Sequence, residues 1–145
     1  MTEFTVLAFT PAGHCRPDLA IAACRAGGVG VVNGELLPDS AQARHALDAL
    51  SAATAAPYGA KCDAIDAEME AALRSHARRG LQWLVVDAAL VTVHAALVRE
   101  LRAAGVKVTH LDYPRLVHGF VGMAGVLPAA RKALSEICQS LTEQL

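Results

Sequence analysis

The sequence predicts an α/β fold of about five βα units, in which a parallel sheet is covered by helices. Short apolar runs alternate with longer, alanine-rich segments, at roughly thirty residues per repeat, as in chains of βα units. Each run is bounded by Gly, Pro or Asp and is almost continuously apolar, which is typical of parallel strands with both faces covered. No Ser-rich or low-complexity linker interrupts the chain, so we expect residues 1–145 to form a single α/β domain.

The five predicted strands share short length and a content of β-branched or aromatic residues. They are expected over residues 4–9, 29–33, 58–62, 83–87 and 106–111.

The first two helices have recognisable ends. Pro17 suits the first turn of a helix that stops near residues 27–28, a Gly-Gly pair. Asp39 or Ser40 can cap the second helix, which we expect to run to Pro57.

The remaining helices follow the same logic. Asp63 or Asp66 can cap a third helix that stops at Gly80. A fourth is expected over residues 92–105 and a fifth over residues 127–145, because Leu and other apolar residues recur there at helical spacing.

The order of the strands is open between two arrangements. A half-barrel order, 1-2-3-4-5, leaves one face of the sheet and two edge strands open, and therefore predicts a homodimer. A flavodoxin-like order, 2-1-3-4-5, covers both faces with helices and suits a monomer.

Composition limits the function classes. The chain has 145 residues, 54% hydrophobic and 19% charged, with a formal net charge of −1. This charge gives no basic surface for nucleic acid, and no apolar run is long enough to span a membrane. The N-terminus does not resemble a secretory leader, and the four cysteines are widely spaced without a C-x-x-C motif. We therefore expect a cytoplasmic protein with reduced thiols.

Two segments of the first four units resemble a known family. The run PDLAIAACRAGGVGV at residues 17–31 is similar to the opening of nitronate monooxygenases (2-nitropropane dioxygenases), and PYGAK at residues 57–61 is similar to their third strand. The resemblance covers residues 4–88 and implies the first half of an FMN-dependent (β/α)₈ barrel, so that residues 1–88 form a flavin-barrel-like part. In that family the flavin phosphate generally sits in Gly-rich loops of the second half, beyond the five units predicted here.

This resemblance and the sheet topology together give a set of candidate cofactor-binding residues. Ligands of parallel βα sheets bind at the carboxyl ends of the strands, where polar residues of this chain follow each predicted strand. That rim predicts a site for a small phosphorylated or carboxylated ligand, and we expect FMN to bind weakly and without turnover. The candidate residues are Gly13, Gly28, Gly30, Asn33 and Lys61.

The C-terminal third resembles a different family. The run LRAAGVKVT at residues 101–109 and the motif VHGF at residues 117–120 are similar to the C-terminus of hormone-sensitive-lipase-like α/β-hydrolase esterases, over residues 97–145. The resemblance implies that His118 is a catalytic base oriented by an acid, for which Asp87 is the candidate. Such a base needs a serine in a G-x-S-x-G turn, and none of the five serines has glycines at that spacing.

Other ionisable side chains are assigned structural roles. His45 and His76 lie among polar helix positions and are expected to be solvated, and Asp66 is expected to complement a helix dipole. His14 and Cys15 could approach other strand-end residues, but a zinc site normally needs closer ligand spacing and three or four ligands, so we expect no metal.

Three functional hypotheses follow. The first is an incomplete nitronate-monooxygenase-like domain that binds a phosphate-bearing ligand such as FMN without turnover. The second is an esterase-like hydrolase that uses His118, and the third is a non-catalytic fold fragment, a chimera joined near residues 87–97, or an assembly partner. Each enzymatic interpretation lacks residues essential to it, so the binding interpretation is placed first.

Overall fold

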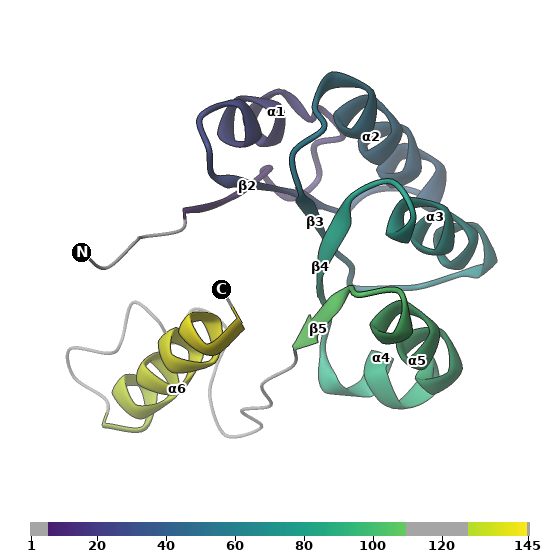
Figure 1. Ribbon diagram of the computed structural model, residues 1–145. Helices are drawn as coiled ribbons and strands as arrows, with labels where there is room; N and C mark the ends of the chain where they lie inside the picture. The colour runs from purple at the N-terminus through teal and green to yellow at the C-terminus, as the bar shows by residue number, and fades with distance from the viewer. Residues whose placement is uncertain (1–5, 110–127, 145) are drawn as a thin grey trace. The chain divides into compact units, whose positions relative to one another are not determined.

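The computed structural model describes residues 6–109 and 128–144. The chain divides into two compact units, Met1–His110 and Leu111–Leu145, and each is described by itself. In the first unit, five parallel strands form one sheet and alternate with helices (Figure 1), which confirms the predicted α/β class and its five βα units. The single domain over residues 1–145 stays a prediction.

The strands lie close to their predicted positions, and β4 differs for an identifiable reason. A bulge pairs Tyr58 with Leu81 and Gly59 with Trp83, so the intervening Gln82 has no partner residue. This exposed polar residue interrupts the apolar run from which the strand was predicted to begin at Trp83. The bounds are β1 Leu7–Phe9, β2 Val29–Asn33, β3 Tyr58–Lys61, β4 Leu81–Val85 and β5 Lys107–Thr109.

The helices also follow the prediction, with one correction. The single helix expected over residues 92–105 is two helices that meet at His94, because Asp87 caps an earlier start through a hydrogen bond from the Leu90 backbone N–H. The bounds in the first unit are α1 Asp18–Arg25, α2 Ser40–Ala53, α3 Ala67–Ala77, α4 Ala88–Val93 and α5 Ala95–Ala103. In the second unit, α6 spans Pro128–Gln144.

The strands are arranged in the order β1-β2-β3-β4-β5. The half-barrel order is therefore confirmed, and the flavodoxin-like order is wrong. Right-handed crossovers, the usual hand of βαβ units, would carry the helices between consecutive neighbouring strands to the same side of the sheet. Figure 1 shows this arrangement, with α1 to α5 along one face of the strands.

The core of the first unit lies between the sheet and these helices. Helix α1 approaches β2 closely at Gly30, where an added Cβ would lie 2.6 Å from the carbonyl carbon of Ala20. A glycine is needed there for space. The fully buried leucines of the core are Leu47, Leu50, Leu73, Leu81, Leu84, Leu97 and Leu101.

The opposite face of the sheet carries a mixed set of side chains. Val31 and Trp83 pack closely around Gly59, where an added Cβ would lie 3.1 Å from Val31 and 3.3 Å from Trp83. The Lys107 ammonium lies 5.4 Å from the centre of the Trp83 ring, a cation–π contact. None of the helices α1 to α5 lies on this face.

In the described segments, no helix is both long and apolar enough to cross a bilayer.

Candidate functional site

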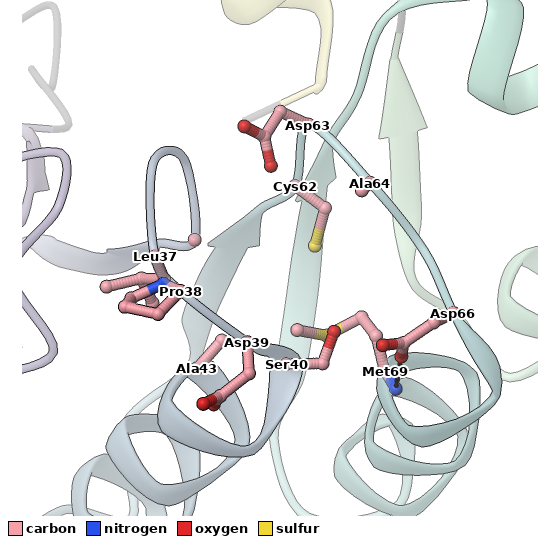
Figure 2. Close-up of a pocket in the computed structure, with 11 residues that line it drawn as sticks. Leu37, Pro38, Asp39, Ser40, Ala43, Cys62, Asp63, Ala64, Asp66 and Met69 are labelled. Atoms are coloured by element: carbon pink, nitrogen blue, oxygen red, sulfur yellow. Dashed lines mark hydrogen bonds between the residues drawn. The ribbon is translucent and has the colours of Figure 1, made fainter.

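A cavity of about 190 Å³ lies at the carboxyl ends of β2 and β3. The loops that lead from these strands into α2 and α3 form its walls (Figure 2), with Gly34 just after β2 and Cys62 just after β3. The apolar part of the cavity wall is formed by Leu37, Ala43 and Met69. This carboxyl-edge pocket, as we call it, lies where parallel βα sheets usually bind ligands.

Two helices begin at the carboxyl-edge pocket, and each is capped by its own aspartate. The Asp39 carboxylate accepts a hydrogen bond from the Gln42 backbone N–H at 2.9 Å, and Asp66 accepts one from the Met69 N–H at 2.8 Å. Of the two cap candidates that the sequence allowed for each helix, Asp39 caps α2 and Asp66 caps α3. Both capping carboxylates sit at the positive ends of helix dipoles, as expected for Asp66.

Ser40 and Asp66 face the pocket from different βα units. Ser40 is the first residue of α2 and Asp66 directly precedes α3. The hydrogen bond from the Met69 backbone N–H, and secondarily the Ser40 side chain, hold the pKa of Asp66 below its usual range. Asp66 is therefore a carboxylate at neutral pH.

Cys62 places a thiol inside the pocket. Its side chain is only 5% exposed, and Figure 2 shows its sulfur directed toward Ser40 and Met69. Burial, and secondarily the neighbouring Asp63 carboxylate, raise the pKa of this thiol to about 12. The neutral thiol is a poor nucleophile at physiological pH.

Three of the predicted cofactor-binding residues come together beside this pocket. The Lys61 ammonium lies 2.7 Å from a Glu35 carboxylate oxygen, and the Asn33 side-chain amide donates to the same oxygen at 3.4 Å. The Gly13 N–H donates to the Glu35 carbonyl at 2.8 Å. Lys61 is thus neutralised by Glu35, and an anion would have to compete with that ion pair.

The other predicted site residues lie elsewhere. Gly28 and Gly30 lie at the amino end of β2, where they pack against the backbones of Val6 and Ala20. Asp87 follows β4, and its carboxylate caps α4. His118 lies outside the described residues.

A second polar cluster lies at the other end of β3, where Tyr58 and His76 are buried and Asp48 is partly exposed. The Tyr58 hydroxyl lies 2.6 Å from His76 Nδ1, and His76 Nε2 lies 3.2 Å from an Asp48 carboxylate oxygen. The Asp48 carboxylate can only accept, so the neutral His76 ring carries its proton on Nε2 and the Tyr58 hydroxyl donates to Nδ1; burial raises the pKa of this hydroxyl to about 12. His76 is only 1% exposed, so the prediction that it is solvated is wrong, whereas His45 is exposed as predicted.

The burial of His76 predicts a pH-dependent stability. Burial lowers the pKa of His76 below its ordinary value, and the nearby Arg79 adds to this against the opposing Asp48 carboxylate. As the pH falls, the His76 side chain therefore becomes protonated in the unfolded chain before it does so in the folded chain. The free energy of unfolding should consequently fall as the pH drops below about 6.5. Urea unfolding at pH 7.5, 6.5 and 5.5 measures this loss. His76→Gln should show a smaller loss over the same range, and equal losses in both proteins would contradict the assignment.

Comparison with protein-family models, curated proteins and solved structures finds no significant match for this chain.

The sequence predicted a ligand site at the carboxyl edge but not the residues that line the pocket, and it did not reveal the Tyr58–His76–Asp48 cluster, although a signal for that cluster was present. Met69, Leu73 and His76 recur at helical spacing, so the buried face of α3 includes the histidine. The pocket has no comparable signal, because Ser40 and Asp66 are brought together only by the pairing of β2 with β3. Among the residues that the structure describes, no three His, Cys, Asp or Glu side chains are placed to hold a metal ion.

Proposed function

We propose that this chain is an incomplete, nitronate-monooxygenase-like βα domain that binds a small ligand in the carboxyl-edge pocket without turning it over. The observation that carries the proposal is the consecutive parallel order of the strands, with a cavity at the carboxyl ends of two neighbours. This is the order of neighbouring units in a (β/α)₈ barrel, whose ligands bind at the same edge.

The chemistry of the pocket supports binding rather than catalysis. A general base or nucleophile needs a pKa suited to its task, but the Cys62 thiol is protonated and Asp66 is held in a helix cap. No Lys, Arg or His is among the described residues that line the cavity.

A screen of small molecules tests the proposal. Weak binders should shift the backbone amide signals of Gly34, Asp63 and Met69 in ¹H–¹⁵N spectra. Ala64→Phe places a bulky side chain at the pocket and should abolish these shifts, whereas Ala52→Phe on the exposed side of α2 should leave them unchanged. The proposal is wrong if no compound moves these signals, or if both variants behave alike.

FMN itself fits this edge poorly. Helix N-termini often bind phosphate, but those of α2 and α3 already hold Asp39 and Asp66. The cavity of about 190 Å³ is also smaller than the roughly 300–1,000 Å³ of pockets for larger ligands. We expect a dissociation constant for FMN weaker than about 1 μM and no gain over riboflavin, which lacks the phosphate. Flavin fluorescence titrations measure both constants, and a yellow protein that keeps stoichiometric FMN through gel filtration would contradict this expectation.

The other partners and alternatives stay predictions. The half-barrel order is the arrangement for which the sequence predicts a homodimer, because one face of its sheet carries none of the helices α1 to α5. The cytoplasmic location also stays a prediction, as does hydrolysis through His118. We do not propose the hydrolase as a second function, since the Asp87 carboxylate is engaged as a helix cap.

A further inference from the structure

We propose that a second copy of this chain binds the outer edge of β1, so that two sheets join through antiparallel pairing of β1 with the β1 of the partner. This edge is separate from the carboxyl-edge pocket, which lies between β2 and β3 and the helices that follow them. It also differs from the open sheet face, on which the expectation of a homodimer rests. The inference is therefore independent of the proposed small-ligand function.

The outer edge of β1 presents backbone groups that need a partner. β2 is the neighbour of β1 in the sheet, and no other strand in the part of the chain that the structure describes pairs with it. The Val6 carbonyl and the Thr10 N–H both hydrogen-bond to β2, so alternate residues of β1 face that strand. The N–H and C=O groups of Leu7 and Phe9 therefore point outward.

The side chains along this edge are apolar. Val6 is 64% exposed and Phe9 is 38% exposed, and Leu19 of α1, the helix that packs beside β1, is 49% exposed. Among the described residues, only two other large hydrophobic side chains are exposed, Leu36 and Val93. Edge strands usually carry a charge or a proline that opposes association, and β1 contains neither. The edge therefore favours an apolar strand as its partner.

The other edge of the sheet, formed by β5, is protected. The Val108 carbonyl already accepts a hydrogen bond from the Arg102 guanidinium at 3.1 Å, and Lys107 places a charge in this strand. Both features oppose the addition of another strand. They disfavour a head-to-tail contact, in which β1 of one copy would pair with β5 of the next and build an open chain of copies. Pairing of β1 with β1 is the arrangement that remains for two copies.

A two-fold axis beside Ala8 makes the β1 edge complementary to itself. In antiparallel pairing, Leu7 would exchange both of its backbone hydrogen bonds with the partner's Phe9, and the symmetric pair would do the same. Every outward group of β1 is then satisfied. The pairing also places a leucine opposite a phenylalanine on each side of the axis, which is a favourable cross-strand pair. Because both copies use the same surface, the contact closes as a dimer.

Sedimentation equilibrium of the full chain tests the proposal. A short interface of this kind is expected to have a dissociation constant of about 10–100 μM, so the measurement should cover roughly 5–500 μM. In ¹H–¹⁵N spectra over the same range, the amide signals of Leu7 and Phe9 should shift with concentration more than that of Ala8, whose N–H faces β2. A chain that stays monomeric throughout this range would contradict the proposal.

Two variants of the edge locate the interface. Leu7→Pro removes an outward donor, and proline is tolerated at the first residue of an edge strand, so dimerisation should weaken at least about tenfold. Phe9→Lys keeps the backbone but adds a charge to the edge, and it should weaken the dimer to a similar extent. Val93→Lys is the matched control, because it makes a similar change at a 75% exposed residue of α4. It should leave the constant unchanged.

The Phe9→Lys variant decides the outcome. A dimer whose dissociation constant is the same in Phe9→Lys as in the original chain must form through another surface, such as the open sheet face, and the proposal is then wrong. Equal weakening by Phe9→Lys and Val93→Lys would also overturn it, because added charge would then act without regard to position. Circular dichroism verifies that each variant is folded, and if Leu7→Pro is not, Phe9→Lys and its control still decide.

Discussion

Gly30→Ala is expected to prevent stable folding, with a loss of more than about 3 kcal/mol from the roughly 5–15 kcal/mol typical of a domain. The added Cβ would overlap the backbone of Ala20 in α1, which cannot move aside as a flexible side chain could. Relief would require α1 to shift away from β2 and open the core beneath it. Urea unfolding followed by circular dichroism measures the loss, and a failure to recover folded protein is the extreme form of the same result.

Gly27→Ala is the matched control, because it makes the same chemical change three residues earlier. Gly27 has a φ of +84° and nothing within 4 Å of an added Cβ, so the cost is confined to the left-handed backbone, about 1–2 kcal/mol. Losses of equal size in the two variants would show that space at Gly30 is not limiting.

Tyr58→Phe should lower the free energy of unfolding by about 1–3 kcal/mol, the usual cost of leaving a buried polar group without its partner. The variant keeps the ring in the core but removes the hydroxyl that lies 2.6 Å from His76 Nδ1. That nitrogen has no access to water as a substitute, because His76 is 1% exposed. Equilibrium urea unfolding at pH 7.5, where His76 is neutral, gives the value.

A double-mutant cycle separates this hydrogen bond from packing. In a His76→Leu background the Tyr58 hydroxyl has already lost its partner, so adding Tyr58→Phe should cost much less than it does alone. Additive losses would mean that the hydroxyl stabilises the fold through some other contact.

The sequence predicted the elements of the first unit better than their arrangement. The bounds of β2 were correct because Gly27–Gly28 and Asn33–Gly34 mark both of its ends. The strand order could not be chosen from the sequence, because both orders use the same elements and differ in which strands pair and which faces are covered. The order depends on contacts between units, such as the close fit of Gly30 against α1.

The sequence predicted where the candidate site lies in the fold, but it did not predict the charge of the site. The topology correctly put Asn33 and Lys61 at the carboxyl edge, since parallel strands end together there. Local sequence could not reveal that Glu35 neutralises Lys61, or that Ser40 of the preceding unit faces the same pocket as Asp66, the cap of α3. These arrangements depend on side-chain positions across two strands, and they leave the Lys61 ammonium without a free charge for a phosphate.

The consecutive strand order also has a consequence for how the first unit opens. Each strand pairs only with the units next to it along the chain, so the sheet behaves like a short linear array whose stability is a sum of nearest-neighbour terms. The terminal members β1 and β5 have three residues each and a single neighbour, whereas β3 is paired on both sides. Local unfolding should therefore begin at β1 and β5 and proceed toward the centre of the sheet. The backbone amide hydrogens of β3 should be the last to exchange with solvent.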